Sequence, residues 1–140
     1  MRKALLTGLG GMALVAGSLS LGLSAAAQEA AQNADLAMLS ELEPGAWDIR
    51  FRGAGEETRR VCMRTGLELI QLRHSESNCN RFVVEDGAQQ VTVQYTCRGN
   101  GYGRTNVRRE SNTLVQIQSQ GIEGGAPFEF SAEARRVSSC

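Results

Sequence analysis

The sequence predicts a mainly β protein. It is expected to be an antiparallel meander of about seven strands curled into a half-shell or small barrel, with a short N-terminal helix and one short inserted helix. Two observations support this prediction. From Ala46 onward, apolar residues alternate with polar ones, which is the period of a strand with one buried face. Turn signals rich in glycine separate these runs, at residues 53–55, 86–87, 99–101 and 124–127. Because a flat sheet would leave its apolar face wet, the sheet must curl or be covered by the two helices.

The first predicted helix covers residues 35–43. Its apolar residues recur at spacings of three and four, and Pro44-Gly45 ends it. The second helix is predicted to start at Thr65 and Glu68. These residues lie three positions apart and form a capping box ahead of an apolar run. This helix is expected to end near His74.

The strands follow from the alternation itself. Trp47 and Ile49 begin the first strand, and Val61 and Met63 are expected to point inward from the second, at about residues 57–63. The most regular alternation lies at residues 90–97, and weaker runs lie at 82–85, 102–110, 115–118 and 128–135. In the run at 82–85, Phe82 and Val84 are the expected inward residues.

Residues 1–27 have the pattern of a signal peptide. Arg2 and Lys3 precede 21 uncharged residues, and Ala27 closes a run of small residues that a signal peptidase would accept. Eight of the 21 are Gly or Ser, which favours a cleaved signal over a lasting membrane anchor. We therefore expect a periplasmic or secreted protein without a stable membrane anchor. Residues 28–34 are expected to be a disordered leader, and residues 35–140 a single domain.

The predicted mature chain is close to neutral. Without Arg2 and Lys3 it keeps 13 arginines against 15 acidic residues and has no lysine. Nucleic acid is therefore not an expected partner, because binding to phosphates requires a basic surface.

The four cysteines are expected to form two disulfides in an oxidising compartment. Cys79 and Cys97 flank a predicted hairpin, so we favour the pairs Cys79–Cys97 and Cys62–Cys140. The main alternative is Cys62–Cys79 with Cys97–Cys140. Their spacing does not fit a zinc ribbon.

One detail of the hairpin conflicts with the favoured pairs. A register that pairs Phe82 with Val93 places Cys79 opposite Thr96. A bulge before Arg81 would have to absorb that offset.

The chain also resembles a known family. The motif Leu42-x-Pro44-Gly45-x-Trp47, the cysteine spacing and the end in Cys140 are similar to a family of small proteobacterial periplasmic proteins with a domain of unknown function. The resemblance covers residues 42–140. It departs at Ser138, where members often have glycine. It implies a similar fold and location but no activity.

No catalytic, metal-binding or cofactor-binding motif is found, so we expect a protein that is not an enzyme and needs no cofactor. His74 is the only histidine, and its place at a predicted helix end indicates a capping or surface role. The arginine pairs, such as Arg59-Arg60, could line up as an anion-binding stripe. We favour a solvated face balanced by glutamates.

The expected function is a non-enzymatic binding or interaction module, with an unknown protein or small molecule as partner. The alternative is a carrier or sensor of a small apolar or anionic ligand on the concave face of the sheet. Five aromatic residues are the candidates to face such a ligand: Trp47, Phe51, Tyr95, Phe128 and Phe130.

Overall fold

The computed structural model describes residues 36–53, 57–75 and 78–140. The expected signal peptide and leader lie outside the described residues. The element order is α2 (Ala37–Ser40), β1 (Gly45–Arg52), β2 (Thr58–Met63), the 3₁₀ turn η1 (Leu67–Leu69), β3 (Cys79–Asp86), β4 (Gln90–Cys97), β5 (Gly101–Ser111), β6 (Leu114–Glu123) and β7 (Ala126–Ser138).

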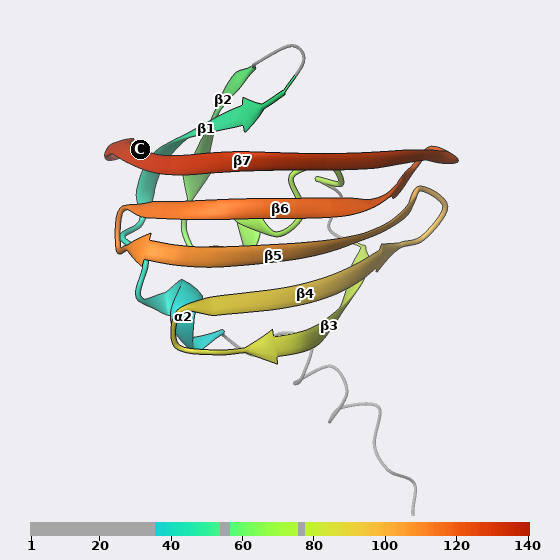
Figure 1. The fold of residues 1–140 in the computed structure, drawn as a ribbon, viewed down its shortest axis with the longest axis horizontal. Helices are drawn as coiled ribbons and strands as arrows, with labels where there is room; N and C mark the ends of the chain where they lie inside the picture. The colour runs from blue at the N-terminus through green and yellow to red at the C-terminus, as the bar shows by residue number, and fades with distance from the viewer. Residues whose placement is uncertain (1–35, 54–56, 76–77) are drawn as a thin grey trace, which may run out of the picture.

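The described strands form one open antiparallel sheet of seven strands, in the order β2-β1-β7-β6-β5-β4-β3 (Figure 1). The predicted strand content and antiparallel pairing are confirmed. The order departs from a simple meander, because the first strand pairs with the last. The edges of the sheet are β2 and β3, which follow each other in sequence. The predicted curling into a half-shell or small barrel is not confirmed.

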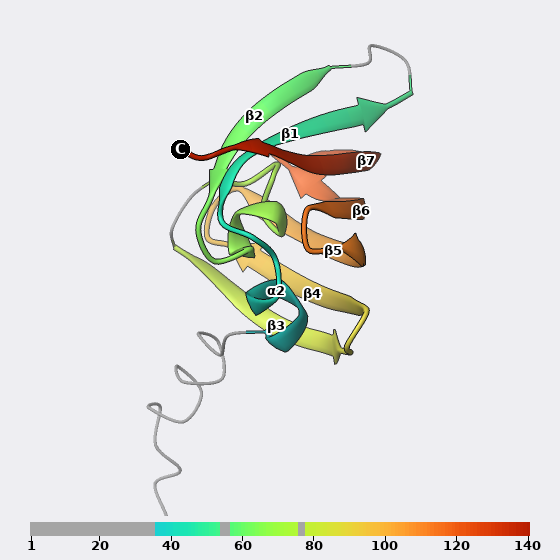
Figure 2. The ribbon, with the colours of Figure 1, turned by 90° about the vertical axis from the view of Figure 1, so that its left-hand side faces the viewer.

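One face of the sheet, here called the inner face, carries the core. Its residues alternate along the strands as predicted, and α2 and the segment around η1 cover them on the same side of the sheet (Figure 2). Covering by helical segments was the second way expected for such a sheet to bury its apolar face. The fully buried side chains include Trp47 and Ile49 of β1, Met63 of β2, and Met38 and Leu39 of α2.

Both helices are shorter than predicted. In α2, the helix proper covers only Ala37–Ser40, and backbone bonds from Glu41 and Leu42 to carbonyls three residues back continue it as a tighter turn. The second helix is reduced to η1, whose N-cap Gly66 has a φ of +84°. A Cβ at residue 66 would press on the Leu39 side chain, so glycine is required there by both conformation and space.

The register of β3 differs from the prediction. Cys79 lies opposite Cys97 and Phe82 opposite Gln94, and the bulge lies at Val84 rather than before Arg81. Phe82 is therefore 70% exposed, and Val83 packs against the core in its place. The alternation of Phe82 and Val84 gave the wrong face because Cys79 lies opposite Cys97, which puts Cys79, Arg81 and Val83 on the inner face and Phe82 and Val84 on the other.

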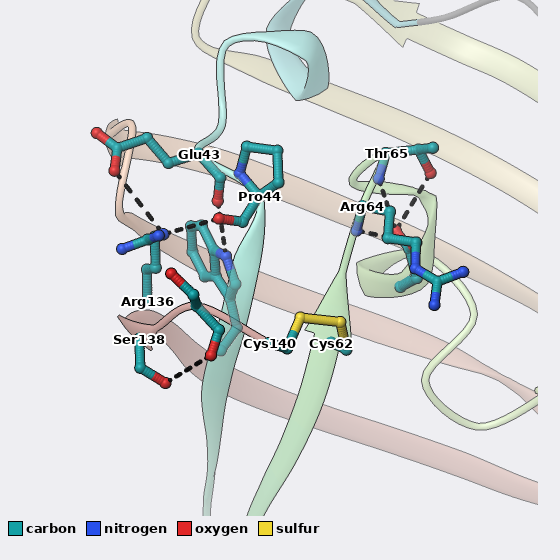
Figure 3. Close-up of a disulfide and its surroundings, with 11 residues drawn as sticks. Glu43, Pro44, Cys62, Arg64, Thr65, Arg136, Ser138 and Cys140 are labelled. Atoms are coloured by element: carbon teal, nitrogen blue, oxygen red, sulfur yellow. Dashed lines mark hydrogen bonds and ion pairs between the residues drawn. A yellow bond between two sulfur atoms is a disulfide. The ribbon is translucent and has the colours of Figure 1, made fainter.

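The disulfides are Cys79–Cys97 and Cys62–Cys140, the pairing favoured from the sequence. The first links directly opposite positions of β3 and β4, with the Cα atoms 4.1 Å apart. The second joins the end of the chain to β2 (Figure 3). Since β2 and β7 both pair with β1, this bond ties together the two neighbours of the Trp47 strand.

Candidate functional site

A cavity of about 470 Å³ lies against the segment that joins β2 to β3. We call residues 64–75 of this connection the crossing segment and the cavity the His74 pocket. The pocket is lined by Arg59, Val61, Thr65, Leu67, Glu68, Gln71, Leu72, His74, Ser75 and Arg81. It thus takes residues from both edge strands and from the segment between them.

The strand order explains why the crossing segment lies on the inner face. Because β2 and β3 are opposite edges of the sheet, their connection must reach from one edge to the other. Its apolar residues Leu69, Ile70 and Leu72 are buried in the core, so it passes over the inner face rather than around the sheet. A segment laid over an apolar face buries side chains but leaves its backbone carbonyls in need of donors.

Side chains of the sheet supply those donors. The Thr105 hydroxyl of β5 donates to the Ile70 carbonyl at 2.7 Å and contacts the Ser119 hydroxyl of β6 at 2.8 Å. The Arg59 guanidinium of β2 donates through Nη2 to the Leu72 carbonyl at 2.9 Å. The crossing segment is therefore fixed by polar contacts as well as by its apolar side chains.

The start of the crossing segment is held by the predicted pair Thr65 and Glu68. The Glu68 carboxylate accepts from the backbone amides of Arg64 and Thr65 and from the Thr65 hydroxyl. The Thr65 hydroxyl accepts from the Leu67 amide, one residue earlier than a capping box requires. This pair stabilises a turn and occupies the carboxylate of Glu68.

His74 is fully buried, so the predicted capping or surface role is wrong. Its Nδ1 lies 3.1 Å from the Tyr95 hydroxyl, and its ring packs edge-on against the Tyr95 ring. Its Nε2 is buried without a hydrogen-bond partner. A buried polar nitrogen without a partner costs free energy, and this one belongs to a residue that lines a cavity.

Arg59 carries a second such nitrogen. Its Nε is also buried without a hydrogen-bond partner, and its guanidinium lies 5.2 Å from the centre of the Phe51 ring. Arg59 and His74 are the two residues of the described chain that carry unpartnered buried side-chain nitrogens, and both line the same pocket. Such nitrogens are usually satisfied by a ligand or ordered water.

The charges around the pocket favour an anion. Arg59 and Arg81 contribute two positive charges against one negative charge from Glu68. Glu68 is already engaged with the donors of the turn, and Arg81 Nε donates to Gln71 at 2.8 Å. The lining therefore has a net positive charge before the protonation state of His74 is considered.

The five candidate aromatic residues divide into two groups. Trp47 and Tyr95 are fully buried in the core, and the Trp47 indole donates to the Glu43 carbonyl. Phe51, Phe128 and Phe130 form a row of ring contacts, with centroids 5.1 Å apart for Phe51 and Phe130 and 6.2 Å for Phe128 and Phe130. None of the five lines the His74 pocket.

The row of phenylalanines borders a second hollow of about 400 Å³. Arg59 lines both this hollow and the His74 pocket, and Arg73 lies 5.6 Å from the centre of the Phe128 ring. The structure therefore brings three of the expected residues together beside the site, with Arg59 in both linings.

Several arginines of the predicted pairs are engaged by acidic residues. Arg60 donates to both carboxylate oxygens of Asp48, at 2.6 and 2.9 Å, and this bond lowers the pKa of Asp48 below its ordinary value of 3.8. Arg108 pairs with Glu110, and Arg135 with Glu133. The balanced, solvated face favoured from the sequence describes these residues better.

Sequence reasoning named Arg59 and His74 but did not place either at a pocket, for different reasons. Val61 and Met63 were expected inward, and the same period of two puts Arg59 on that face, so a signal for Arg59 was present. His74 had no such signal. Its burial follows from the path of the crossing segment, which depends on which strands form the edges of the sheet.

Among the described residues, no three His, Cys, Asp or Glu side chains gather in a group that could hold a metal ion. Over the same ranges, no helix has the length and apolar character needed to span a membrane.

The chain was compared with family models, with curated proteins and with solved structures. None of the three comparisons gives a match.

Proposed function

We propose that this protein is an exported, non-enzymatic binding module that holds a small molecule in the His74 pocket. The observation that carries the proposal is the pair of buried nitrogens, Arg59 Nε and His74 Nε2, that lack partners at one cavity. Each would cost about 1–3 kcal/mol if it stayed unsatisfied, and a bound ligand removes that cost. The cavity volume lies within the range of about 300–1,000 Å³ typical of small-molecule sites.

The proposal places the ligand on a concave side of the sheet. Arg59 lies on edge strand β2 and Arg81 on edge strand β3, and both line the His74 pocket. Because residues from the two opposite edge strands line one pocket, we propose that the sheet bends around the crossing segment, as in the expected half-shell.

The surroundings of His74 support binding rather than catalysis. A catalytic histidine is usually oriented by a carboxylate on one nitrogen and faces a nucleophile with the other. Here Nδ1 contacts the Tyr95 hydroxyl, and the Glu68 carboxylate accepts backbone amides of its own turn.

Export is part of the same proposal. Two disulfides are compatible with an oxidising compartment, and the first 27 residues have the composition of a signal peptide. Membership of the periplasmic family of unknown function, which rests on the Pro-Gly-x-Trp motif and the cysteine spacing, belongs to the proposal as well.

Native mass spectrometry tests the proposal on protein purified gently from the compartment to which it is exported. We expect a discrete extra mass that is present under native conditions and lost on denaturation. The denatured mass should lack residues 1–27 and four thiol hydrogens. A native mass equal to the denatured one, over several preparations, would contradict the proposed function.

A matched pair of variants assigns the extra mass to the pocket. Val61→Phe should fill the cavity and abolish the adduct, because Val61 lines it. Val137→Phe makes the same change at a side chain that is 45% exposed, and should keep the adduct. An adduct that survives in Val61→Phe would place the ligand elsewhere.

A further inference from the structure

We infer that the ligand of the His74 pocket is a small monocarboxylate with an apolar body. The inference rests on the proposed function and adds the chemical class of the ligand. Its carboxylate is assigned to Arg59 Nε and His74 Nε2, and its apolar body to the surface formed by Val61, Leu67 and Leu72.

The charge of the pocket selects a monoanion. Two arginines against one glutamate leave a single excess positive charge in the lining. A neutral ligand would leave that charge without a counterion in a partly desolvated site, which costs free energy. A phosphate ester, with nearly two negative charges at neutral pH, exceeds the charge that the lining offers.

The hydrogen-bonding groups select a carboxylate among monoanions. A carboxylate has two oxygens that accept hydrogen bonds, and bonds to ionised groups are stronger than neutral ones. Arg59 Nε always carries a hydrogen. His74 Nε2 carries one when Nδ1 accepts the Tyr95 hydroxyl hydrogen, and also in the imidazolium form. The two unpartnered nitrogens thus match in number the two acceptor oxygens of a carboxylate.

The rest of the lining requires an apolar body. Leu72 is nearly buried, and Val61 and Leu67 are half-buried side chains that pack against the core. Burial of apolar ligand surface contributes about 25 cal/mol per Å². The carboxylate therefore orients the ligand, and the contact with these side chains holds it.

The test compares four probes of equal chain length by calorimetric titration of the purified, disulfide-bonded protein. The probes are octanoate, octanol, octylamine and octyl phosphate. Octanoate should bind at least tenfold more tightly than each of the other three. Binding of octanol or octylamine as tight as that of octanoate would overturn the monoanion. Tighter binding of octyl phosphate would overturn the carboxylate.

Two arginine variants complete the test. Arg59→Gln should lower the ratio of octanoate affinity to octanol affinity about tenfold. This ratio separates the lost contact with the carboxylate from any change in the pocket that follows loss of the bond to the Leu72 carbonyl. Arg98→Gln removes the same charge from an exposed residue of the β4–β5 turn and should change neither affinity. Equal octanoate affinity in Arg59→Gln and the parent protein would overturn the assignment.

Failure of this inference is distinct from failure of the proposed function. If octanoate is not preferred but native mass spectrometry shows an adduct that Val61→Phe abolishes, the pocket binds a ligand of another class. If no probe binds and no adduct is found, the inference and the proposed function both fail.

Discussion

At the scale of residues, the orientation of His74 depends on a glycine that does not touch it. The Tyr95 ring lies against Gly103 of the neighbouring strand, so closely that a Cβ at residue 103 would collide with its hydroxyl and ring. The same hydroxyl contacts His74 Nδ1. Gly103 therefore provides the space in which Tyr95 positions His74.

The variant Gly103→Ala tests this dependence. It should lower the free energy of unfolding by about 1–3 kcal/mol, because Tyr95 must move within a packed core. Urea denaturation measures the loss. Gly87→Ala is the control, since a Cβ there meets only the Gln90 carbonyl at 3.1 Å. An unchanged midpoint for Gly103→Ala would show that Tyr95 does not need this space.

The ion pair of Asp48 with Arg60 predicts a pH dependence of stability. The hydrogen bond from Arg60 lowers the pKa of Asp48 in the folded protein below 3.8, so the pair stabilises the fold above that pH. This contribution is lost as the pH falls through the lowered pKa. It is small, because the Arg60 side chain is 64% exposed.

Asp48→Asn tests this prediction. The variant should be less stable than the parent at pH 7, and the difference should shrink as the pH falls below 3.8 and through the lowered pKa of Asp48. Urea denaturation from pH 7 to pH 2.5 measures it. Asp86→Asn, at an exposed position of β3, is the matched control. A difference that is constant over this pH range would argue against the pair.

At the scale of elements, the crossing segment is the part of the chain on which the site depends. Thr105→Val removes the donor to the Ile70 carbonyl and the contact with Ser119 in the core. We expect a loss of about 1–3 kcal/mol in the free energy of unfolding and faster amide exchange in residues 66–74. Thr96→Val, at an exposed position of β4, should change neither. Unaltered exchange in Thr105→Val would show that apolar packing alone holds the segment.

The two disulfides should differ in their effect on stability. In the chain-entropy model, the bond Cys62–Cys140, which spans 78 residues, contributes about 4.5 kcal/mol. The bond Cys79–Cys97 spans 18 residues and contributes about 3 kcal/mol. Replacing each pair by alanine and measuring unfolding by urea tests this order. A larger loss for Cys79 and Cys97 would show that packing of the buried Cys97 outweighs loop length.

The elements also show how far the sequence leads. Strand β4 was predicted with its bounds, because Val91, Val93 and Tyr95 alternate without interruption and all three are buried. Strand β3 was predicted in the wrong register, because its apolar residues Phe82 and Val84 lie on the exposed face, whereas Cys79 and Val83 pack against the core. The helix at η1 was predicted too long, because the capping pair Thr65 and Glu68 is equally compatible with a single turn.

At the scale of the whole molecule, one pairing decides where the site is. β1 pairs with β7, so the ends of the described sheet are β2 and β3, and their connection must pass over the inner face. Local sequence patterns do not reveal that β1 pairs with β7, since a pairing between strands far apart in sequence depends on the fold of the whole chain. The pairing therefore explains why the burial of His74 could not be predicted from its neighbours.

An NMR titration of ¹⁵N-labelled protein with octanoate tests directly whether Arg59 and His74 bind a carboxylate in the His74 pocket. It follows the side-chain nitrogen signals of Arg59 and His74. We expect the signals of Arg59 Nε and His74 Nε2 to shift together and to saturate at the same octanoate concentration. Saturable shifts of other residues with both of these signals unmoved would contradict it.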